Sequence, residues 1–207
     1  GREIKVIPWG IDTSIFTFLP KPLPDRIQFL HIGNFNEVKD QGTLLNAFRL
    51  INKNIPAHLT IIGEGYLEMK VKSLVKNLRL EENVTFLTPM LYELLPDIYH
   101  RSDILLHTSR AEGQCEVVTE AMSCGVVVCG THVGIMYDLH PACCVTAPVA
   151  DFRSLSEQVL ALVKDPERVS ELRKAAHHWA SQHSLSWTVD QLTLLYDELI
   201  SQEIFTQ

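Results

Sequence analysis

Short apolar runs alternate with longer amphipathic segments along most of this chain. The apolar runs are rich in β-branched residues and lack alternating polar positions, which is typical of strands that are covered on both faces of a sheet. The predicted strands are residues 27–31, 58–62, 84–87, 103–106 and 126–129, with 143–145 as a sixth candidate. The predicted intervening helices are residues 39–52, 67–78, 91–100 and 116–123. This alternation predicts an α/β fold, a Rossmann-like parallel sheet flanked by helices.

The two ends of the chain have a different character. Residues 155–163, 167–181 and 187–201 follow helical spacing without intervening strands, so residues 152–207 are expected to form C-terminal helices. Three prolines within residues 18–25 indicate a loop, and residues 1–25 are expected to be a junction or linker segment. No internal repeat divides the chain, so residues 1–207 are predicted to be one domain.

Charge and cysteine content exclude several classes of function. Lys and Arg number 18 against 25 Asp and Glu, and the net charge of −7 argues against binding to nucleic acid or to an anionic membrane surface. No apolar run reaches the ~18 residues that a transmembrane helix needs, and the N-terminal residues lack the apolar core of a signal peptide. Five cysteines without a C-x-x-C pair predict no metal site and favour the reducing cytoplasm.

Open parallel sheets bind ligands beyond the carboxyl ends of their strands. After the first predicted strand, Gly33 and Asn34 lead to Lys39, whose ammonium group could bind a phosphate. The alternative is a strand that ends at a glycine, followed by a surface lysine. After the second strand, Gly63 and Gly65 lack the spacing of a dinucleotide fingerprint and equally fit a tight turn.

The loop after the fourth predicted strand is the most informative. Glu112 lies in this loop, and Glu120 follows eight positions later inside the next helix. Gly113 allows a sharp turn before that helix, whose first backbone N–H groups would form an anion site at the ligand edge. An anion site between two carboxylates that accept hydrogen bonds from diols suits a nucleotide diphosphate sugar. The alternative is two solvated glutamates at a helix N-terminus, where acids are common.

Three further side chains lie near this edge. Cys115 is at the predicted helix start, where a thiol becomes more reactive, although a packing role is the alternative. His107 and His132 lie at or near strand ends and could face the ligand.

Five segments of the chain match a known family in order. They are VIPWGIDTSIF, LHIGNFNEVKDQGTLLNAF, LTIIGEG, SDILLHTSRAEGQCEVVTEAMSCGVVVCGTHVG and SWTVDQLTLLYDEL. With these segments the chain resembles the C-terminal, donor-binding domain of GT-B retaining glycosyltransferases of family 4 (glycosyl transferases group 1). The pair Glu112 and Glu120 matches the family's E-x7-E motif.

The resemblance assigns roles to these residues. Glu112 would be the catalytic-site acid that contacts hydroxyls of the donor sugar, and Glu120 would bind the ribose diol. Lys39 would neutralise the diphosphate, and Gly33 would leave room for the phosphates. The remaining implied donor-binding positions are Asn34, Gly63, Gly65, Gly113, Gln114, Cys115 and Glu116. The family transfers sugar with retention of configuration and without a metal or another cofactor.

Some positions depart from the family pattern. Asn34 replaces the usual arginine and supplies no charge, which removes a charge-assisted bond of ~1.5–3 kcal/mol. Gln114 and Cys115 replace the last two residues of a G-F-G motif, Ile135 replaces a glycine, and Trp9 replaces an asparagine. These changes leave the base (UDP-, GDP- or ADP-linked) and the sugar open.

The family's enzymes place the active site between two such domains. The resemblance therefore implies an N-terminal acceptor-binding domain that is absent from this chain, and membrane contact only through that domain. This chain alone is expected to be inactive. The alternatives are a catalytically degenerate nucleotide-binding domain, a GT-B epimerase or phosphorylase, and a flavodoxin-like signalling domain. The last would need an acidic cluster where this chain has Gly33 and Asn34.

Overall fold

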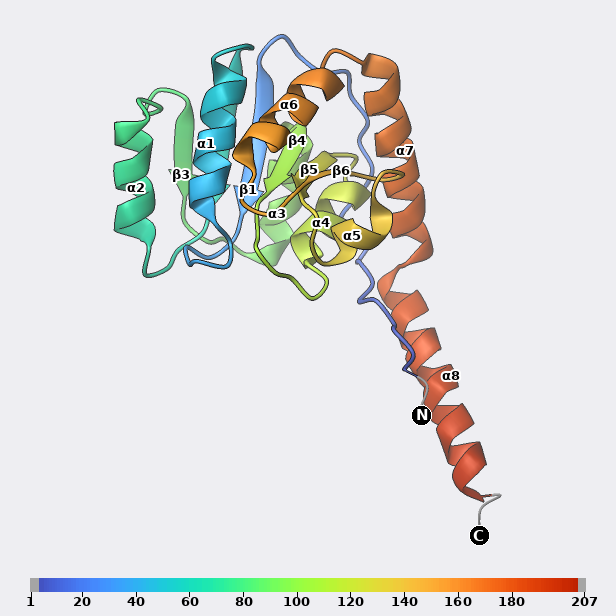
Figure 1. The fold of residues 1–207 in the computed structure, drawn as a ribbon. Coiled ribbons are helices and arrows are strands. Elements are labelled where there is room, and N and C mark those ends of the chain that lie inside the picture. Colours follow the sequence, from blue (N-terminus) through green and yellow to red (C-terminus); the bar gives the residue numbers. More distant parts are fainter. Residues whose placement is uncertain (1–3, 205–207) are drawn as a thin grey trace.

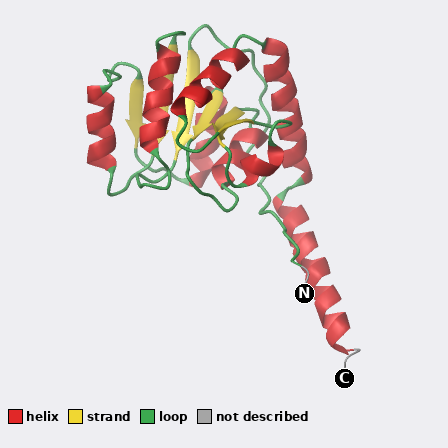
Figure 2. Ribbon diagram, in the orientation of Figure 1, coloured by secondary structure: helices red, strands yellow, loops and turns green. Residues whose placement is uncertain are grey.

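The computed structural model describes residues 4–204 and contains one six-stranded sheet (Figures 1 and 2). All strand pairs are parallel, in the order β3-β2-β1-β4-β5-β6. The strands are β1 (Ile27–Ile32), β2 (Ala57–Ile62), β3 (Val84–Leu87), β4 (Ile104–His107), β5 (Val127–Thr131) and β6 (Val145–Ala147). The chain places β2 and β3 on one side of β1, and then β4, β5 and β6 on the other side. The position between β1 and β4, where the order of the strands reverses, is a switch point, and doubly wound sheets bind ligands there. The predicted α/β fold is confirmed.

Neighbouring residues of each central strand point to opposite faces of the sheet, and each face has its own core. On β1, Phe29 belongs to one apolar cluster and Leu30 to the other. The first cluster is covered by α1 (Gln41–Asn52), α2 (Glu68–Asn77) and α6 (Phe152–Leu162). The second is covered by α3 (Leu95–Arg101), α4 (Glu116–Ser123) and α5 (Ile135–Leu139). Burial on both faces explains why the strands carry unbroken apolar runs.

Helix α7 (Pro166–Gln182) closes one side of the body (Figure 1). Its buried residues Val169 and Leu172 join the first core, whereas Ala176 and Ala180 join the second. Asp165 caps its start by accepting a 2.9 Å hydrogen bond from the backbone N–H of Arg168. One helix therefore ties the two layers together at the edge of the sheet.

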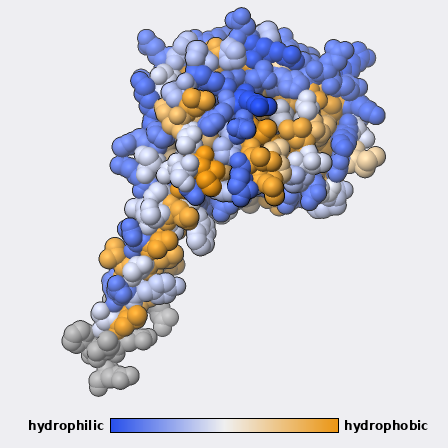
Figure 3. Space-filling model, turned by 180° about the vertical axis from the view of Figure 1, so that it is seen from behind, coloured by the Kyte–Doolittle hydropathy of each residue, from blue (hydrophilic) through white to orange (hydrophobic). Residues whose placement is uncertain are grey.

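Helix α8 (Leu185–Ile204) extends away from the body (Figures 1 and 3), and the N-terminal segment lies beside it (Figure 1). The Leu185 N–H donates to the Ile11 carbonyl at 3.0 Å, and the Thr188 hydroxyl donates to the Pro8 carbonyl at 2.8 Å. Large apolar side chains on this helix are at least half exposed, including Leu194, Tyr196, Leu199 and Ile200. Among the residues that the structure describes, no helix combines the length and apolarity that a bilayer span requires.

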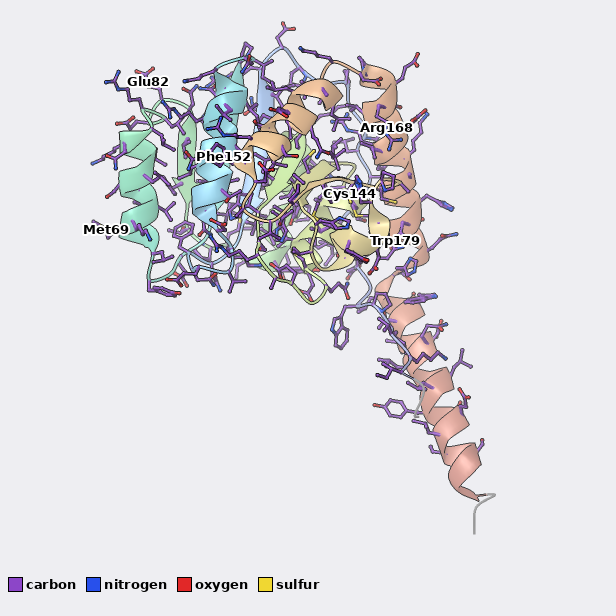
Figure 4. The ribbon with its side chains drawn as sticks, in the orientation of Figure 1. Met69, Glu82, Cys144, Phe152, Arg168 and Trp179 are labelled. Atoms are coloured by element: carbon purple, nitrogen blue, oxygen red, sulfur yellow. The ribbon has the colours of Figure 1, made fainter. Side chains whose placement is uncertain are left out.

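The loop predicted over residues 18–25 contains neither helix nor strand. Elsewhere the element bounds differ from expectation. The helix expected over residues 91–100 is a short 3₁₀ turn (Tyr92–Leu94) followed by α3, because Pro96 fits only the first turn of a helix. The last strand begins at Val145 rather than at residue 143. Cys144, which is labelled in Figure 4, precedes this strand and is buried.

Two helical features were not anticipated. Helix α5 has only five residues, too few to show a helical period. Helix α8 begins at Leu185 rather than at residue 187, and the hydroxyl of Ser184 accepts the N–H of Trp187 at 3.2 Å. This hydroxyl satisfies one of the free N–H groups at the helix start.

Candidate functional site

The loops after β1 and β4 are bound together at the switch point of the sheet. The Thr108 hydroxyl donates to the Lys39 carbonyl at 3.1 Å, and the Arg110 N–H donates to the Val38 carbonyl at 2.7 Å. The Arg110 side chain also forms an ion pair of 3.1 Å with Asp40, whose carboxylate caps α1. These contacts hold Lys39 against a loop that lies far from it in sequence.

Glu112 lies between two cationic groups at this edge. Its Oε1 is 2.6 Å from Nζ of Lys39 and 3.3 Å from Nε2 of His107. Burial would raise the pKa of Glu112, but the hydrogen bonds with His107 and Lys39 outweigh it and lower this pKa to about 2. Glu112 is therefore ionised at neutral pH and fixed in position.

His107, the last residue of β4, is almost completely buried beneath this carboxylate. Burial would lower its pKa, but hydrogen bonds with Cys115 and Glu112 raise it to about 9. The Nε2 atom is 3.5 Å from Sγ of Cys115. Protonated His107, Lys39 and ionised Glu112 together leave an excess of positive charge, which favours an anionic ligand.

Helix α4 starts directly after Cys115. Cys115 has a left-handed backbone (φ 76°), and no side chain caps the helix. The first N–H groups of α4 are thus free of a side-chain partner and can bind an anion. A Cβ atom added to Gly113 would meet nothing within 4 Å, so the space beside this loop is open.

Glu120 lies on the inner face of α4. The residue is 4% exposed, and its carboxylate accepts a 2.6 Å hydrogen bond from the Tyr99 hydroxyl of α3. Burial raises the pKa of Glu120, and that of Tyr99 is also raised well above its usual value. The structure thus brings Lys39, Glu112 and Cys115 into one cluster and places Glu120 against Tyr99.

The predicted glycines have packing roles. A Cβ atom on Gly63 would lie 2.1 Å from the Gly33 carbonyl oxygen, and one on Gly65 would lie 2.6 Å from the Phe35 carbonyl oxygen. A Cβ atom on Gly33 would lie 3.3 Å from Cδ of Lys39. The lysine side chain therefore packs in the space over Gly33, and these glycines allow the loops after β1 and β2 to approach closely.

The other predicted residues have varied environments. Asn34 and Glu116 are exposed. The Gln114 amide binds the backbone of Trp9 twice, accepting from its N–H and donating to its carbonyl, both at 2.6 Å. His132 pairs with the Thr146 hydroxyl at 2.9 Å, not with the Glu112 cluster.

The predicted site did not include Tyr99, and it left His107 only as a candidate. Tyr99 occupies an ordinary apolar position of a helix, so no local pattern distinguishes it from a core residue. For His107 the signal was its place at the carboxyl end of a strand.

Comparisons with known proteins agree with this architecture. The chain is 33% identical over 140 residues to N-acetyl-alpha-D-glucosaminyl L-malate synthase of Bacillus anthracis, covering 67% of this chain and 36% of that protein. It is similar in structure to Anabaena HepE in complex with UDP and glucose, with a TM-score of 0.82 and 20% identity. That match covers 94% of this chain and 57% of HepE.

A shorter solved structure has a similar extent to this chain. It is the C-terminal domain of a glycosyl transferase group 1 family protein, LpcC, from Francisella tularensis. The TM-score is 0.75 at 16% identity, and the match covers 84% of this chain and 97% of that domain. The chain spans between about a quarter and a half of the length of the curated relatives that it matches. The model of glycosyl transferases group 1 matches residues 19–179. The chain belongs to the glycosyl transferases group 1 family.

Proposed function

We propose that this chain is the donor-binding domain of an enzyme that transfers a sugar from a nucleotide diphosphate sugar with retention of configuration. One observation carries the proposal: the Glu112 carboxylate is held by Lys39 and His107 beside the uncapped start of α4. An ionised carboxylate beside a cationic, N–H-lined site suits a ligand that has a diphosphate next to hydroxyl groups.

In this proposal the leaving diphosphate binds to Lys39 and to the backbone N–H groups of residues 113–116. Fixed cations and N–H dipoles stabilise the charge that develops on a departing phosphate without a metal ion. The protonated imidazole of His107 adds to this positive field from beneath the site. No metal or other cofactor takes part in the proposed reaction.

Glu112 is the proposed sugar-binding acid. Its low pKa keeps it ionised, so it accepts hydrogen bonds from sugar hydroxyls over the whole neutral range. Lys39 would then bridge the carboxylate and the phosphate, which fixes the sugar relative to its leaving group. Such fixed positioning is a major source of rate enhancement.

Glu120 is the proposed ribose ligand. Tyr99 binds its Oε2 atom, so the hydroxyl orients the carboxylate and leaves Oε1 for the ribose diol. A buried carboxylate binds a diol more strongly than an exposed one because water competes less.

The acceptor would bind to a second domain facing this edge of the sheet. Support comes from the relatives, because this chain covers only about a quarter to a half of their length. The solved complex of HepE with UDP and glucose makes UDP the first nucleotide to test. The exposed apolar side chains of α8 would pack against the acceptor domain.

A second candidate function is a nucleotide-binding domain without turnover. The exposed Asn34 favours it, because this side chain supplies no charge where the resemblance predicts an arginine. Both candidates bind nucleotides, so donor-dependent transfer in an enzyme that includes an acceptor domain separates them.

Calorimetric titration of the chain with UDP, GDP, ADP and their sugar conjugates tests the donor site. We expect binding of one nucleoside diphosphate on the order of −4 to −6 kcal/mol, because only half of the proposed site is present. Lys39→Met should weaken this binding. The matched control is Lys72→Met, which removes a surface lysine of α2 that pairs with Glu68. The proposal would be contradicted if the chain bound none of these nucleotides, or if the two lysine variants changed nucleotide affinity equally.

A further inference from the structure

A cavity of about 720 Å³ lies at the amino ends of the strands, at the edge of the sheet opposite Lys39 and Glu112. We propose that this cavity binds a small amphipathic anion, an apolar chain or ring that carries one carboxylate. Its walls are the proline-rich loop of residues 18–25, the start of β1, the turn before β2, the end of α6 and the first half of α7. The starts of β1 and α7 lie at the same end of the body (Figure 1). The proposal does not depend on the proposed function, because none of these residues belongs to the donor site.

The lining of the cavity is mainly apolar and stiff. Ile27, Ile55 and Val169 contribute aliphatic side chains. Five prolines also line the cavity, and they supply fixed φ angles and no N–H donors (Pro20, Pro22, Pro24, Pro56 and Pro166). Cavities of ~300–1,000 Å³ with mainly apolar walls and a few polar groups are typical of small-molecule sites. The body of the ligand is therefore expected to be apolar.

The proline-rich loop is anchored across the amino edge of the sheet. Nζ of Lys21 donates to the His100 carbonyl at 2.9 Å and lies 3.1 Å from Oδ1 of Asp103. From the other side, Nη1 of Arg173 in α7 donates to the Lys21 carbonyl. These contacts fix one wall of the cavity against the sheet and α7, so the cavity is preformed.

Two cationic side chains of the lining lack a carboxylate partner. Arg173 is 5% exposed, and its guanidinium donates to the carbonyls of Lys21 and Asp103. Its Nε has no hydrogen-bond partner in the described part of the chain. Lys174 follows it and is exposed, and neither side chain forms an ion pair with any residue that the structure describes. A buried cation with an unused donor favours an anionic ligand, because burial of an uncompensated charge is costly.

The charge around the cavity suits a single carboxylate. Lys21 is paired with Asp103, and the exposed Asp25 is the one acid in the lining. The three cations therefore exceed the two acids by one positive charge. A monovalent carboxylate balances that charge, whereas a divalent phosphate would lose more hydration energy against apolar walls.

Calorimetric titration of the full chain with sodium hexanoate, octanoate and decanoate tests the site. We expect one site whose affinity rises about fourfold with each added CH₂ group, until the chain fills the cavity. Acetate should not bind, because it lacks the apolar body. Octanamide, which has the same chain without the charge, should bind at least about tenfold more weakly than octanoate.

Three variants locate the site. Lys174→Met should weaken octanoate about threefold and leave octanamide unchanged. Its matched control is Lys164→Met, which removes an exposed lysine outside the lining and should bind octanoate as the wild type does. Ser170 is exposed and lines the cavity, so the large side chain of Ser170→Trp should fill the space and abolish binding. Circular dichroism should first establish that each variant is folded.

Other results would overturn the proposal. Absence of binding by all the acids, or undiminished octanoate binding in Ser170→Trp, would exclude the cavity as the site. Equal affinities for octanoate and octanamide would exclude an anion-binding role of Arg173 and Lys174. Sedimentation measurements show whether a second copy of the chain occupies the cavity instead. A dimer that Ser170→Trp dissociates, in a chain that binds no octanoate, would replace the ligand site by a protein interface.

Discussion

Lys39 and Glu112 are 73 residues apart in the sequence, and their side chains form an ion pair of 2.6 Å. The pair is possible because β1 and β4 are neighbours in the sheet and their following loops share the same edge. Both side chains are mostly shielded from water, which strengthens the interaction compared with a surface pair. This pair is the structural centre of the proposed donor site.

Asn34→Arg should strengthen the binding of nucleoside diphosphates about tenfold if the guanidinium reaches the phosphates. The exposed position of Asn34 leaves space for the longer side chain. Affinity for the uncharged nucleoside should stay the same. Calorimetry on both ligands makes the measurement, with Asn34→Gln as the uncharged control. Equal gains for nucleoside and diphosphate would refute the assignment of this position to the phosphates.

Glu120→Gln should weaken the binding of the nucleoside and of the nucleoside diphosphate by similar factors, because the carboxylate is assigned to the ribose. The change keeps the size of the side chain, and Tyr99 can still donate to the amide oxygen. Circular dichroism should first establish that the variant is folded. An unaltered affinity for the nucleoside would disprove the ribose role.

His31 should make the protein less stable in mild acid. It is fully buried, and burial lowers its pKa to about 4, against an ordinary value of 6.5. Above pH 6.5 the imidazole is neutral in both the folded and the unfolded state, so His31 does not make the free energy of unfolding depend on pH. Between pH 6.5 and about 4 only the unfolded state takes up the proton, so the free energy of unfolding falls by up to about 3 kcal/mol.

Urea denaturation of His31→Leu at a series of pH values measures this effect. The variant should lose less stability than the wild type between pH 6.5 and 4, although it also loses the hydrogen bond of Nδ1 with the Leu106 carbonyl. The control is the exposed His178→Leu, which should follow the wild-type profile. Parallel profiles for His31→Leu and the wild type would count against a neutral buried imidazole.

Gly63→Ala should destabilise the protein by about 1–3 kcal/mol, because the new Cβ atom would overlap the Gly33 carbonyl. The same backbone shift should weaken nucleotide binding, since Gly33 supports the side chain of Lys39. Gly113→Ala is the matched control, with an expected change within about 0.5 kcal/mol because its Cβ atom would contact nothing. Thermal unfolding compares the two variants, and equal melting temperatures would contradict the packing role.

The isolated chain should form no glycoside from any nucleotide sugar. Holding donor and acceptor together is worth ~7–11 kcal/mol of the barrier, and the proposed acceptor domain is needed for it. Product analysis with a panel of donors and sugar acceptors makes the measurement. Detectable transfer would refute the two-domain proposal, whereas slow hydrolysis of the donor would not.

The sequence predicted strands β1 to β5 and most helices because parallel strands covered on both faces leave an uninterrupted apolar signal. The approach of Lys39 to Glu112 could also be expected, since both follow strands that end at one edge of a sheet. The bond between Tyr99 and Glu120 could not be, because it depends on the packing of α3 on α4. Likewise, the role of Gly63 depends on a backbone contact with Gly33 that no local pattern records.

The attachment of α8 has a mechanical consequence. Backbone hydrogen bonds join Ile11 to both His183 and Leu185. The Gln114 side chain forms two hydrogen bonds with the backbone of Trp9. A rotation of α8 about the turn at Ser184 must therefore carry the N-terminal segment with it and pull on the loop that starts α4. The start of the projecting helix is thus connected, through residues 9–11 and Gln114, to the loop that precedes α4.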